Sequence, residues 1–235
     1  MSTVKARRMA LGSRLYLVAS IGGSSVLILV HHLRVGRSVF TVWLLEELGL
    51  DYELKLYDRL DTGRAPPSLK DAHPLGKSPV IEIDIAGERL TLAESGAIAS
   101  VLVEHFDPAH VFAPPRSDEA AFAKWTNWLH YPEGSGVLPL IFKLLTSRAG
   151  EPVNPIVDAF TQGELDLHLG YLNDILSAQN YVCGDIFQAP DVGVTFLAQM
   201  AMGLELLADY PGIASYLQKN MSRPAFSRAV EKTGG

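Results

Sequence analysis

Residues 26–49 read Val-Leu-Ile-Leu-Val-His-His-Leu-Arg-Val-Gly-Arg-Ser-Val-Phe-Thr-Val-Trp-Leu-Leu-Glu-Glu-Leu-Gly, and this stretch decides the fold. It begins with an apolar run over 26–32 that ends in two histidines, which predicts a central strand covered on both faces. Ser38 to Leu48 predicts a helix, because its large apolar residues share one face and Gly49 stands where a helix ends. The stretch is therefore a strand, a polar loop and a helix.

The residues that follow alternate short strands with helices. We expect strands at 52–57, 80–85 and 88–92, and helices near 68–72 and over 95–106. Ala86-Gly87 predicts a tight turn that joins the last two strands in a hairpin. This order predicts a mixed α/β domain.

A linker and an all-helical domain follow. Residues 107–116 contain three prolines and no regular pattern, so we place the domain linker there. Beyond it the periodicity predicts helices at 120–145, 157–177, 190–207, 213–220 and 224–232, the first of them broken near Pro132. The predicted organisation is an N-terminal extension (1–25), an α/β domain (26–106), the linker (107–116) and an all-helical domain (117–235).

The composition favours a globular cytoplasmic protein. Hydrophobic residues make up 48% of the 235 residues and charged residues 20%, which is too apolar for a disordered chain. The net charge of −6 argues against nucleic-acid binding, which needs a basic excess. The single cysteine, Cys183, excludes an internal disulfide and fits a reducing compartment. Four histidines lack metal-ligand spacing with any Cys or carboxylate cluster, so we expect no metal; they are His105, His110, His130 and His168.

The N-terminus combines a basic start with an apolar stretch. Four Lys and Arg residues between positions 5 and 14 precede an apolar run over 15–30, the order found in secretory signals and membrane anchors. However, Gly22-Gly23-Ser24-Ser25 interrupts the run, and cleavage there would remove the predicted first strand. We therefore expect neither a signal nor a membrane anchor. No other segment approaches the ~20 apolar residues that span a bilayer.

Four motifs stand in the chain in a defined order. They are the strand–loop–helix stretch over 30–49, the approach Ala65-Pro66-Pro67 and His73–Val80, the turn Leu92–Ile98, and the pairs Gly184-Asp185 and Pro190-Asp191. Together they resemble glutathione transferases, most closely a fungal and bacterial cytosolic subgroup, over about residues 26–232. The resemblance implies a thioredoxin-like N-terminal domain (βαβ-α-ββα) and an all-helical C-terminal domain, with the last motif forming a turn and a buried aspartate. It also implies a homodimer and glutathione as co-substrate or cofactor.

The resemblance implies which residues hold glutathione. Ser78-Pro79 matches a cis-proline position that pairs with the tripeptide backbone, the alternative being a trans proline that opens a strand. Glu94 and Ser95 match the γ-glutamyl site, the alternative being simple helix capping. Lys77 and Arg37 are the nearest cations for the carboxylates of glutathione, although Lys77 also fits a solvated loop lysine.

The loop after the first strand departs from the family at the residue that stabilises the thiolate. Most members hold Tyr, Ser or Cys there, and the matching positions here are His31, Gly36 and Arg37. Ser38 is the only hydroxyl of the loop, which predicts Ser38 and Arg37 as the catalytic residues. Two alternatives stay open: Ser38 only caps the helix, and His31 is either a ligand-binding or a packed residue.

The resemblance implies an electrophile site between the two domains. Its expected wall lies at the break in the first helix of the second domain and consists of Tyr131, Glu133, Ser135 and Leu138. The expected function is conjugation of the glutathione thiolate to a small hydrophobic electrophile, as in detoxification. Because the usual hydroxyl is replaced, two alternatives remain. One is a biosynthetic isomerase that adds glutathione to an activated alkene and releases it, and the other is a non-catalytic ligand-binding protein.

Overall fold

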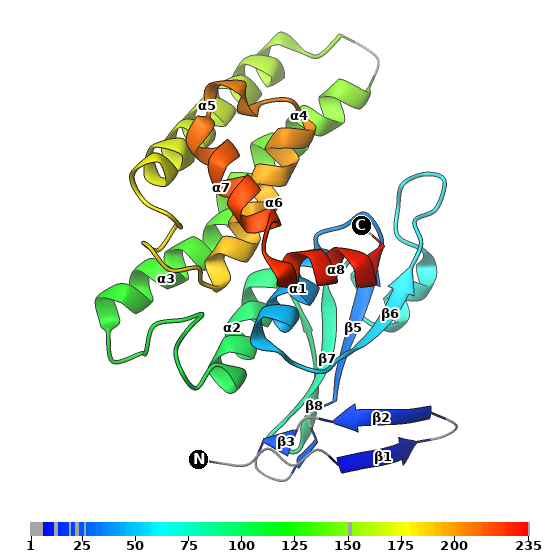
Figure 1. Ribbon diagram of the computed structural model, residues 1–235. Coiled ribbons are helices and arrows are strands. Elements are labelled where there is room, and N and C mark those ends of the chain that lie inside the picture. Colours follow the sequence, from blue (N-terminus) through cyan, green and yellow to red (C-terminus); the bar gives the residue numbers. More distant parts are fainter. Residues whose placement is uncertain are drawn as a thin grey trace. The chain divides into compact units, whose positions relative to one another are not determined.

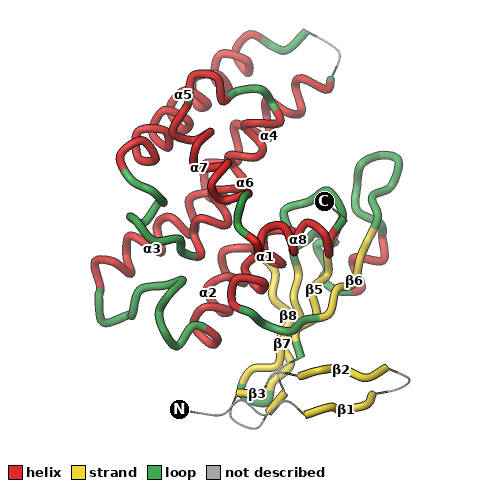
Figure 2. Tube along the Cα trace, in the orientation of Figure 1, coloured by secondary structure: helices red, strands yellow, loops and turns green. Residues whose placement is uncertain are grey.

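The computed structural model describes residues 7–11, 14–18, 20–21, 24–25, 27–149 and 152–234. The chain divides into two compact units. One contains the residues up to Leu102 and those from Arg228 onward, and the other contains Val103–Ser227. The first unit is mixed α/β and the second is helical, which confirms the predicted fold class (Figures 1 and 2).

The first unit is built on a four-stranded sheet in the order β6-β5-β7-β8. The strands are β5 (Ile28–Leu33), β6 (Glu53–Tyr57), β7 (Val80–Ile85) and β8 (Glu88–Ala93). β5 and β6 run parallel, whereas β7 is antiparallel to both of its neighbours. Alternate residues point to opposite faces, so one face is apolar and the other carries polar side chains such as His31 and Glu82.

Helices α1 (Ser38–Leu48) and α2 (Ser95–Phe106) have the predicted bounds. α1 ends at Gly49, whose φ of 65° is left-handed and whose N–H donates to the carbonyls of Glu46 and Leu45. The 3₁₀ helix η1 (Pro67–Asp71) corresponds to the predicted short helix. Its Leu69 is fully buried against Leu33 and Tyr57, so η1 covers the carboxyl ends of β5 and β6.

Short antiparallel strands precede this sheet. β1 (Arg7–Leu11) pairs with β2 (Arg14–Val18), and β3 (Ser20–Ile21) pairs with β4 (Ser24–Ser25). Part of the apolar run over 15–30 lies outside the described residues. Within the described ranges, no helix has the length and apolarity needed to cross a membrane.

The second unit contains a kinked helix followed by three further helices. α3 (Glu119–Tyr131) continues through a π-helical turn, η2 (Pro132–Gly136), into α4 (Val137–Arg148), which confirms the predicted break. Then follow α5 (Pro155–Ala178), α6 (Ala189–Gly203), the 3₁₀ turn η3 (Leu207–Asp209) and α7 (Pro211–Met221). The prediction that α6 extends to 207 is wrong, because Glu205 adopts a left-handed φ of 60° and ends the helix.

Asp191 organises the start of α6. Its side chain is fully buried and accepts the N–H groups of Gln188 (2.8 Å) and Val182 (3.0 Å) and the hydroxyl of Tyr216 (2.9 Å). Burial raises the pKa of Asp191 to about 6. The buried aspartate implied by the sequence is therefore confirmed, and it joins the turn before α6 to α7.

The last helix, α8 (Pro224–Thr233), crosses the boundary between the units. Its later part belongs to the first unit, where Glu46 of α1 accepts from Arg228 (2.7 Å) and Lys232 (2.5 Å). Tyr52 donates its hydroxyl to the same carboxylate at 2.5 Å. Glu46 is therefore a single acceptor that links α8, α1 and the residue before β6.

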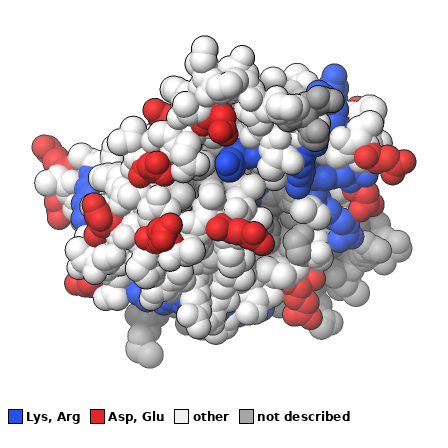
Figure 3. Space-filling model, turned by 90° about the horizontal axis from the view of Figure 1, so that it is seen from above, with Lys and Arg blue, Asp and Glu red and all other residues white. Residues whose placement is uncertain are grey.

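The surface charge is mixed. On the face in Figure 3, Lys and Arg side chains are most numerous on one side but also occur elsewhere, and Asp and Glu are spread among uncharged residues. This pattern agrees with the mild net charge of −6.

Candidate functional site

Strand register brings the predicted glutathione-binding segments to one edge of the sheet. Val80 at the start of β7 is paired both with His31 of β5 and with Ala93 of β8. The residues just before Val80, just after Ala93 and just after Leu33 therefore lie at the same edge. These segments carry six of the predicted residues: Arg37, Lys77, Ser78, Pro79, Glu94 and Ser95.

Ser78 is fastened to the end of β5. Its hydroxyl donates to the carbonyl of His31 (2.7 Å) and accepts the N–H of Leu33 (3.2 Å). The Ser78–Pro79 peptide bond is cis, as predicted. Pro79 is buried, while Lys77 is exposed. Ser78 therefore fixes the local backbone, and Lys77 keeps its ammonium group in solvent.

Ser95 presents a buried hydroxyl at the start of α2. Glu94 adopts a left-handed φ of 70°, and its carbonyl accepts the N–H of Ile98 at 2.9 Å. The Ser95 Oγ is buried and has no hydrogen-bond partner among the residues that the structure describes. Simple capping by Ser95 would give this hydroxyl a backbone partner, so the capping interpretation does not explain it. An unpaired buried hydroxyl is costly and fits a site that a ligand completes.

Ser38 faces the protein interior. Its Oγ lies 2.9 Å from Nδ1 of His32, and both residues are 0% exposed. Arg37 is the N-cap of α1, which has no side-chain capping hydrogen bond, so Ser38 does not act as a cap either. In this conformation the Ser38 hydroxyl is shielded from solvent. Its catalytic role stays a prediction.

His32 is a neutral buried base. Burial, and then the charge of Arg34, lower the pKa of His32 to about 4. Its Nε2 is buried without a hydrogen-bond partner in the described part of the chain. The imidazole therefore stays uncharged at neutral pH, and its one polar contact is with Ser38.

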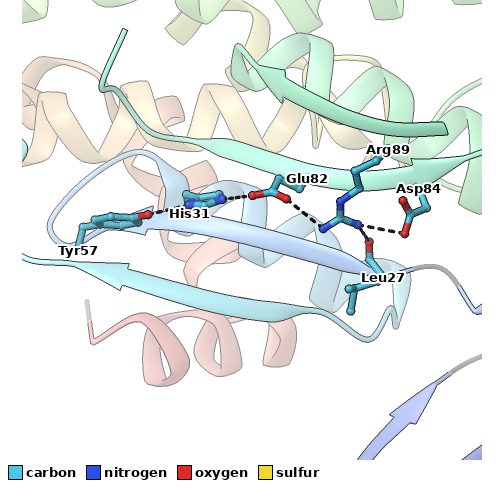
Figure 4. A network of polar contacts seen from close by, with 6 residues as sticks. All are labelled: Leu27, His31, Tyr57, Glu82, Asp84 and Arg89. Carbon is cyan, nitrogen blue, oxygen red and sulfur yellow. Dashed lines mark hydrogen bonds and ion pairs between the residues drawn. The ribbon is translucent and has the colours of Figure 1, made fainter. Parts of the chain in front are cut away.

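His31 belongs to a polar network that crosses all four strands (Figure 4). Its Nδ1 lies 2.9 Å from the Tyr57 hydroxyl, and its Nε2 lies 2.9 Å from Oε1 of Glu82. The other oxygen of Glu82 accepts from Arg89 at 3.3 Å, and Arg89 also contacts Asp84 (3.1 Å) and the carbonyl of Leu27 (2.9 Å).

This network gives His31 the packed role that the sequence left open. His31 is only 2% exposed, and both of its ring nitrogens have partners. Its hydrogen bond, together with the one from Arg89, outweighs burial and holds the pKa of Glu82 below its ordinary value. A ligand-binding role for His31 stays a prediction. Sequence reasoning missed Glu82 and Arg89, although their alternation along the hairpin places them on one face.

The loop between β5 and α1 is held from outside by Arg59. This guanidinium donates from Nε to the carbonyl of Arg34 (3.1 Å) and from Nη2 to that of Val35 (2.9 Å). Its Nη1 donates to the carbonyl of Gly63 at 2.8 Å. No motif marks Arg59, which lies in an exposed loop after β6.

The backbone around Gly36 leaves no room for the serine that the family resemblance leads us to expect at this position. A Cβ added at Gly36 would lie 2.8 Å from the carbonyl oxygen of Leu33 and 3.3 Å from Nη2 of Arg59. The first distance is shorter than a non-bonded contact allows, so any side chain here requires the backbone to move. The loop is therefore shaped around glycine.

The predicted electrophile-binding residues lie along the π-helical break of the second unit. Tyr131 hydrogen-bonds Nδ1 of His168 on α5 at 2.8 Å, and its ring packs edge-on against Trp128. Glu133 is half-buried, Ser135 is exposed, and Leu138 is 49% exposed. Four neighbouring residues thus share one segment, and Leu138 and Ser135 offer accessible side chains.

Burial raises the pKa of Cys183 to about 12, so its thiol stays protonated at neutral pH. In the described ranges, no group of three or more His, Cys, Asp or Glu side chains could hold a metal ion.

Comparisons with known proteins agree with this architecture. Residues 25–104 match the family model for the glutathione S-transferase N-terminal domain. Glutathione S-transferase 3 of Schizosaccharomyces pombe is 33% identical over 222 residues, covering 88% of each chain. The crystal structure of a glutathione S-transferase from Actinobacillus pleuropneumoniae has a TM-score of 0.77 at 33% identity, covering 88% of this chain and 93% of that one. A glutathione transferase homologue from Lodderomyces elongisporus, solved with two glutathione molecules per subunit, shares the fold with a TM-score of 0.75 at 21% identity and covers 87% and 98% of the two chains.

Proposed function

Because the chain belongs to the glutathione transferase family, we propose that it binds glutathione at the carboxyl end of β5 and joins the glutathione thiolate to a small hydrophobic electrophile. The observation that carries this proposal is the buried hydroxyl of Ser95 at the start of α2, which has no hydrogen-bond partner within the described part of the chain. It lies at the sheet edge where Ser78-Pro79 and the β5–α1 loop also meet.

Each end of glutathione has candidate partners at this edge. The γ-glutamyl carboxylate would accept from the Ser95 hydroxyl and from N–H groups at the positive end of α2, while Glu94 would pair with its amine. Ser78 and Pro79 are assigned to the tripeptide backbone. Lys77 and Arg37 supply cations for the carboxylates.

The reaction requires glutathione as a thiolate. A free thiol has a pKa of about 8.5, so most of it is protonated at neutral pH. A cation and hydrogen-bond donors near the sulfur lower this pKa and raise the thiolate fraction. The Ser38 hydroxyl is bonded to His32. We therefore assign stabilisation of the thiolate to the positive charge of Arg37. The thiolate then attacks an electrophilic carbon of the second substrate, for which Tyr131, Glu133, Ser135 and Leu138 are the proposed contacts.

The buried Ser38 and the tight Gly36 favour a second candidate reaction. With no serine at position 36 and Ser38 turned inward, thiolate stabilisation would be modest. An activated alkene is electrophilic enough to react with a weakly stabilised thiolate. Addition of the thiolate, rotation about the resulting single bond and elimination of the thiolate then isomerise the alkene and return glutathione. A protein that binds glutathione without turnover is the third candidate. We further propose that the chain is a homodimer, which sedimentation of the purified chain would test, and that it is cytoplasmic, which cell fractionation would test.

Titration calorimetry with Ser95→Ala tests the glutathione site. Loss of a hydrogen bond to a carboxylate should weaken glutathione binding about tenfold, which corresponds to about 1.4 kcal/mol. Ser147→Ala is the matched control, because this serine is exposed on α4 and bonds only its own helix. If the parent chain shows no binding at millimolar glutathione, the proposal fails.

The reaction type is decided by a substrate panel. Aryl halides, epoxides and enones report conjugation, whereas a cis-configured activated alkene reports isomerisation without consumption of glutathione. Binding without activity toward any of these substrates would favour the non-catalytic candidate.

A further inference from the structure

The β5–α1 loop has an unusual backbone at Val35. This residue has a left-handed φ of 53°, although it is β-branched, and its side chain is 78% exposed. A β-branched residue in this region is a clear outlier that the surrounding structure must enforce. No buried packing of Val35 accounts for it, so the enforcement comes from the backbone contacts of the loop.

Arg59 supplies those contacts. Two of its nitrogens donate to consecutive carbonyls, those of Arg34 and Val35, at 3.1 and 2.9 Å. Its third hydrogen bond, to the carbonyl of Gly63 at 2.8 Å, fixes the guanidinium within its own loop. The β5–α1 loop is also joined to the end of β6 by the N–H of Arg34, which donates to the carbonyl of Tyr57 at 3.0 Å, and by an ion pair between Arg34 and Asp58 at 3.0 Å.

Because peptide units are planar, the two carbonyls held by Arg59 also fix the directions of the N–H groups in the same peptide units. In a trans peptide the N–H points opposite to the C=O of the same unit. Because Arg59 holds the carbonyls of Arg34 and Val35, the N–H groups of Val35 and Gly36 point away from Arg59. Among the described residues, neither of these N–H groups has a hydrogen-bond acceptor.

We propose that Arg59 is a positioning residue that turns the N–H groups of Val35 and Gly36 toward the sulfur of bound glutathione. This inference rests on the proposed function. Two backbone donors would then replace a serine or tyrosine hydroxyl, because the Ser38 hydroxyl of this loop is buried against His32. Gly36 fits this role because a side chain there would collide with the Leu33 carbonyl and crowd Arg59.

The fork geometry of arginine is essential to the proposal. A guanidinium binds two acceptors at once through a rigid plane, whereas a lysine ammonium is a single point charge. Arg59→Lys therefore keeps the charge but loses the paired hold on the two carbonyls. Comparing it with Arg59→Met separates positioning from a simple electrostatic effect of a nearby cation.

The test measures the thiol pKa of bound glutathione from the pH dependence of thiolate ultraviolet absorbance, together with kcat and KM. In Arg59→Met and in Arg59→Lys, we expect the pKa to rise by about one unit, so that the thiolate fraction at neutral pH falls by up to about tenfold. We expect kcat to fall in parallel and KM for glutathione to change less than about threefold. Arg64→Met, which removes an exposed cation of the same loop, should leave all three values unchanged.

Each contrary outcome has a distinct meaning. An unchanged thiol pKa in Arg59→Met overturns the proposal, while glutathione binding by the same variant keeps the proposed function intact. A parental pKa in Arg59→Lys, or an equal shift in Arg64→Met, shows a charge effect and also overturns it. If Arg59→Met does not fold by circular dichroism, Arg59→Lys alone decides. A parent chain that binds no glutathione removes both proposals together.

Discussion

Two neighbouring histidines on β5 have opposite surroundings. His31 has a partner on each ring nitrogen, whereas His32 contacts only Ser38 and keeps a buried Nε2 without one in the described part of the chain. Burial and the charge of Arg34 lower the pKa of His32 to about 4. Protonating His32 therefore costs more free energy in the folded protein than in the unfolded chain.

This difference predicts acid sensitivity. The unfolded His32 binds a proton near its ordinary pKa of 6.5, but the folded one does so only near 4, so stability falls as pH drops between these values. At about pH 4.5 the loss should be about 2–3 kcal/mol relative to neutral pH. Urea unfolding of the parent and of His32→Asn measures it, because an asparagine oxygen can replace Nδ1 as the partner of Ser38 and does not titrate.

Other titrating groups contribute equally to the stability of the parent and of His32→Asn, so they cancel when the two pH profiles are compared. The raised pKa of Asp191 acts in the other direction, since stability from that group declines as pH rises from about 4 to 6, but both chains contain it. Parallel pH profiles for the parent and His32→Asn would show that His32 does not resist protonation.

At the scale of elements, α8 is attached to α1 through one carboxylate. Burial alone would raise the pKa of Glu46, but hydrogen bonds from Lys232, Tyr52 and Arg228 outweigh it and hold the pKa below its ordinary value. The stabilisation is therefore present above the ordinary glutamate pKa and is lost on acidification. Its partners are half-exposed, which keeps its size modest.

Glu46→Gln should release α8. We expect a loss of about 1–2 kcal/mol at neutral pH, together with faster amide hydrogen exchange over residues 228–234. Thermal unfolding and exchange mass spectrometry provide the readouts. Glu231→Gln, on the same helix, removes an equal charge and should leave both unchanged. An intact exchange pattern in Glu46→Gln would contradict this account of the attachment.

The start of α6 depends on Asp191 in a similar way. Asp191→Ala leaves the N–H groups of Val182 and Gln188 and the hydroxyl of Tyr216 without an acceptor in a buried region. The expected cost is about 3 kcal/mol or more, measured by denaturant unfolding. Asp174→Ala on the exposed side of α5 is the control. A cost below about 1 kcal/mol would mean that these buried groups find other partners.

At the scale of the whole molecule, the sequence predicts local features well and distant contacts poorly. The bounds of α1, β7 and α2 follow from nearby signals such as Gly49, Ala86-Gly87 and the alternation of side chains. The end of α6 was missed because nothing local marks Glu205 as left-handed. The sequence motifs did predict that the segments before β7, after β8 and after β5 carry the glutathione-binding residues, because each motif adjoins the end of a predicted strand.

Side-chain directions within the site were not predictable. Ser38 bonds His32, and His31 bonds Tyr57 and Glu82, through partners whose positions depend on strand pairing. Arg59 carries no motif, and its effect on residues 34 and 35 appears only in three dimensions. The grouping of α8 with the first unit likewise rests on contacts between Glu46 and residues more than 180 positions away.

That last contact has a consequence for how the protein is made. A ribosome releases Glu46 early and Arg228 and Lys232 near the end of translation. While the helical half is synthesised, the Glu46 carboxylate of the nascent thioredoxin-like half has the Tyr52 hydroxyl as a partner but lacks both of its cations. The first unit can therefore be completed only after the helical segment between Glu46 and Arg228 has been synthesised.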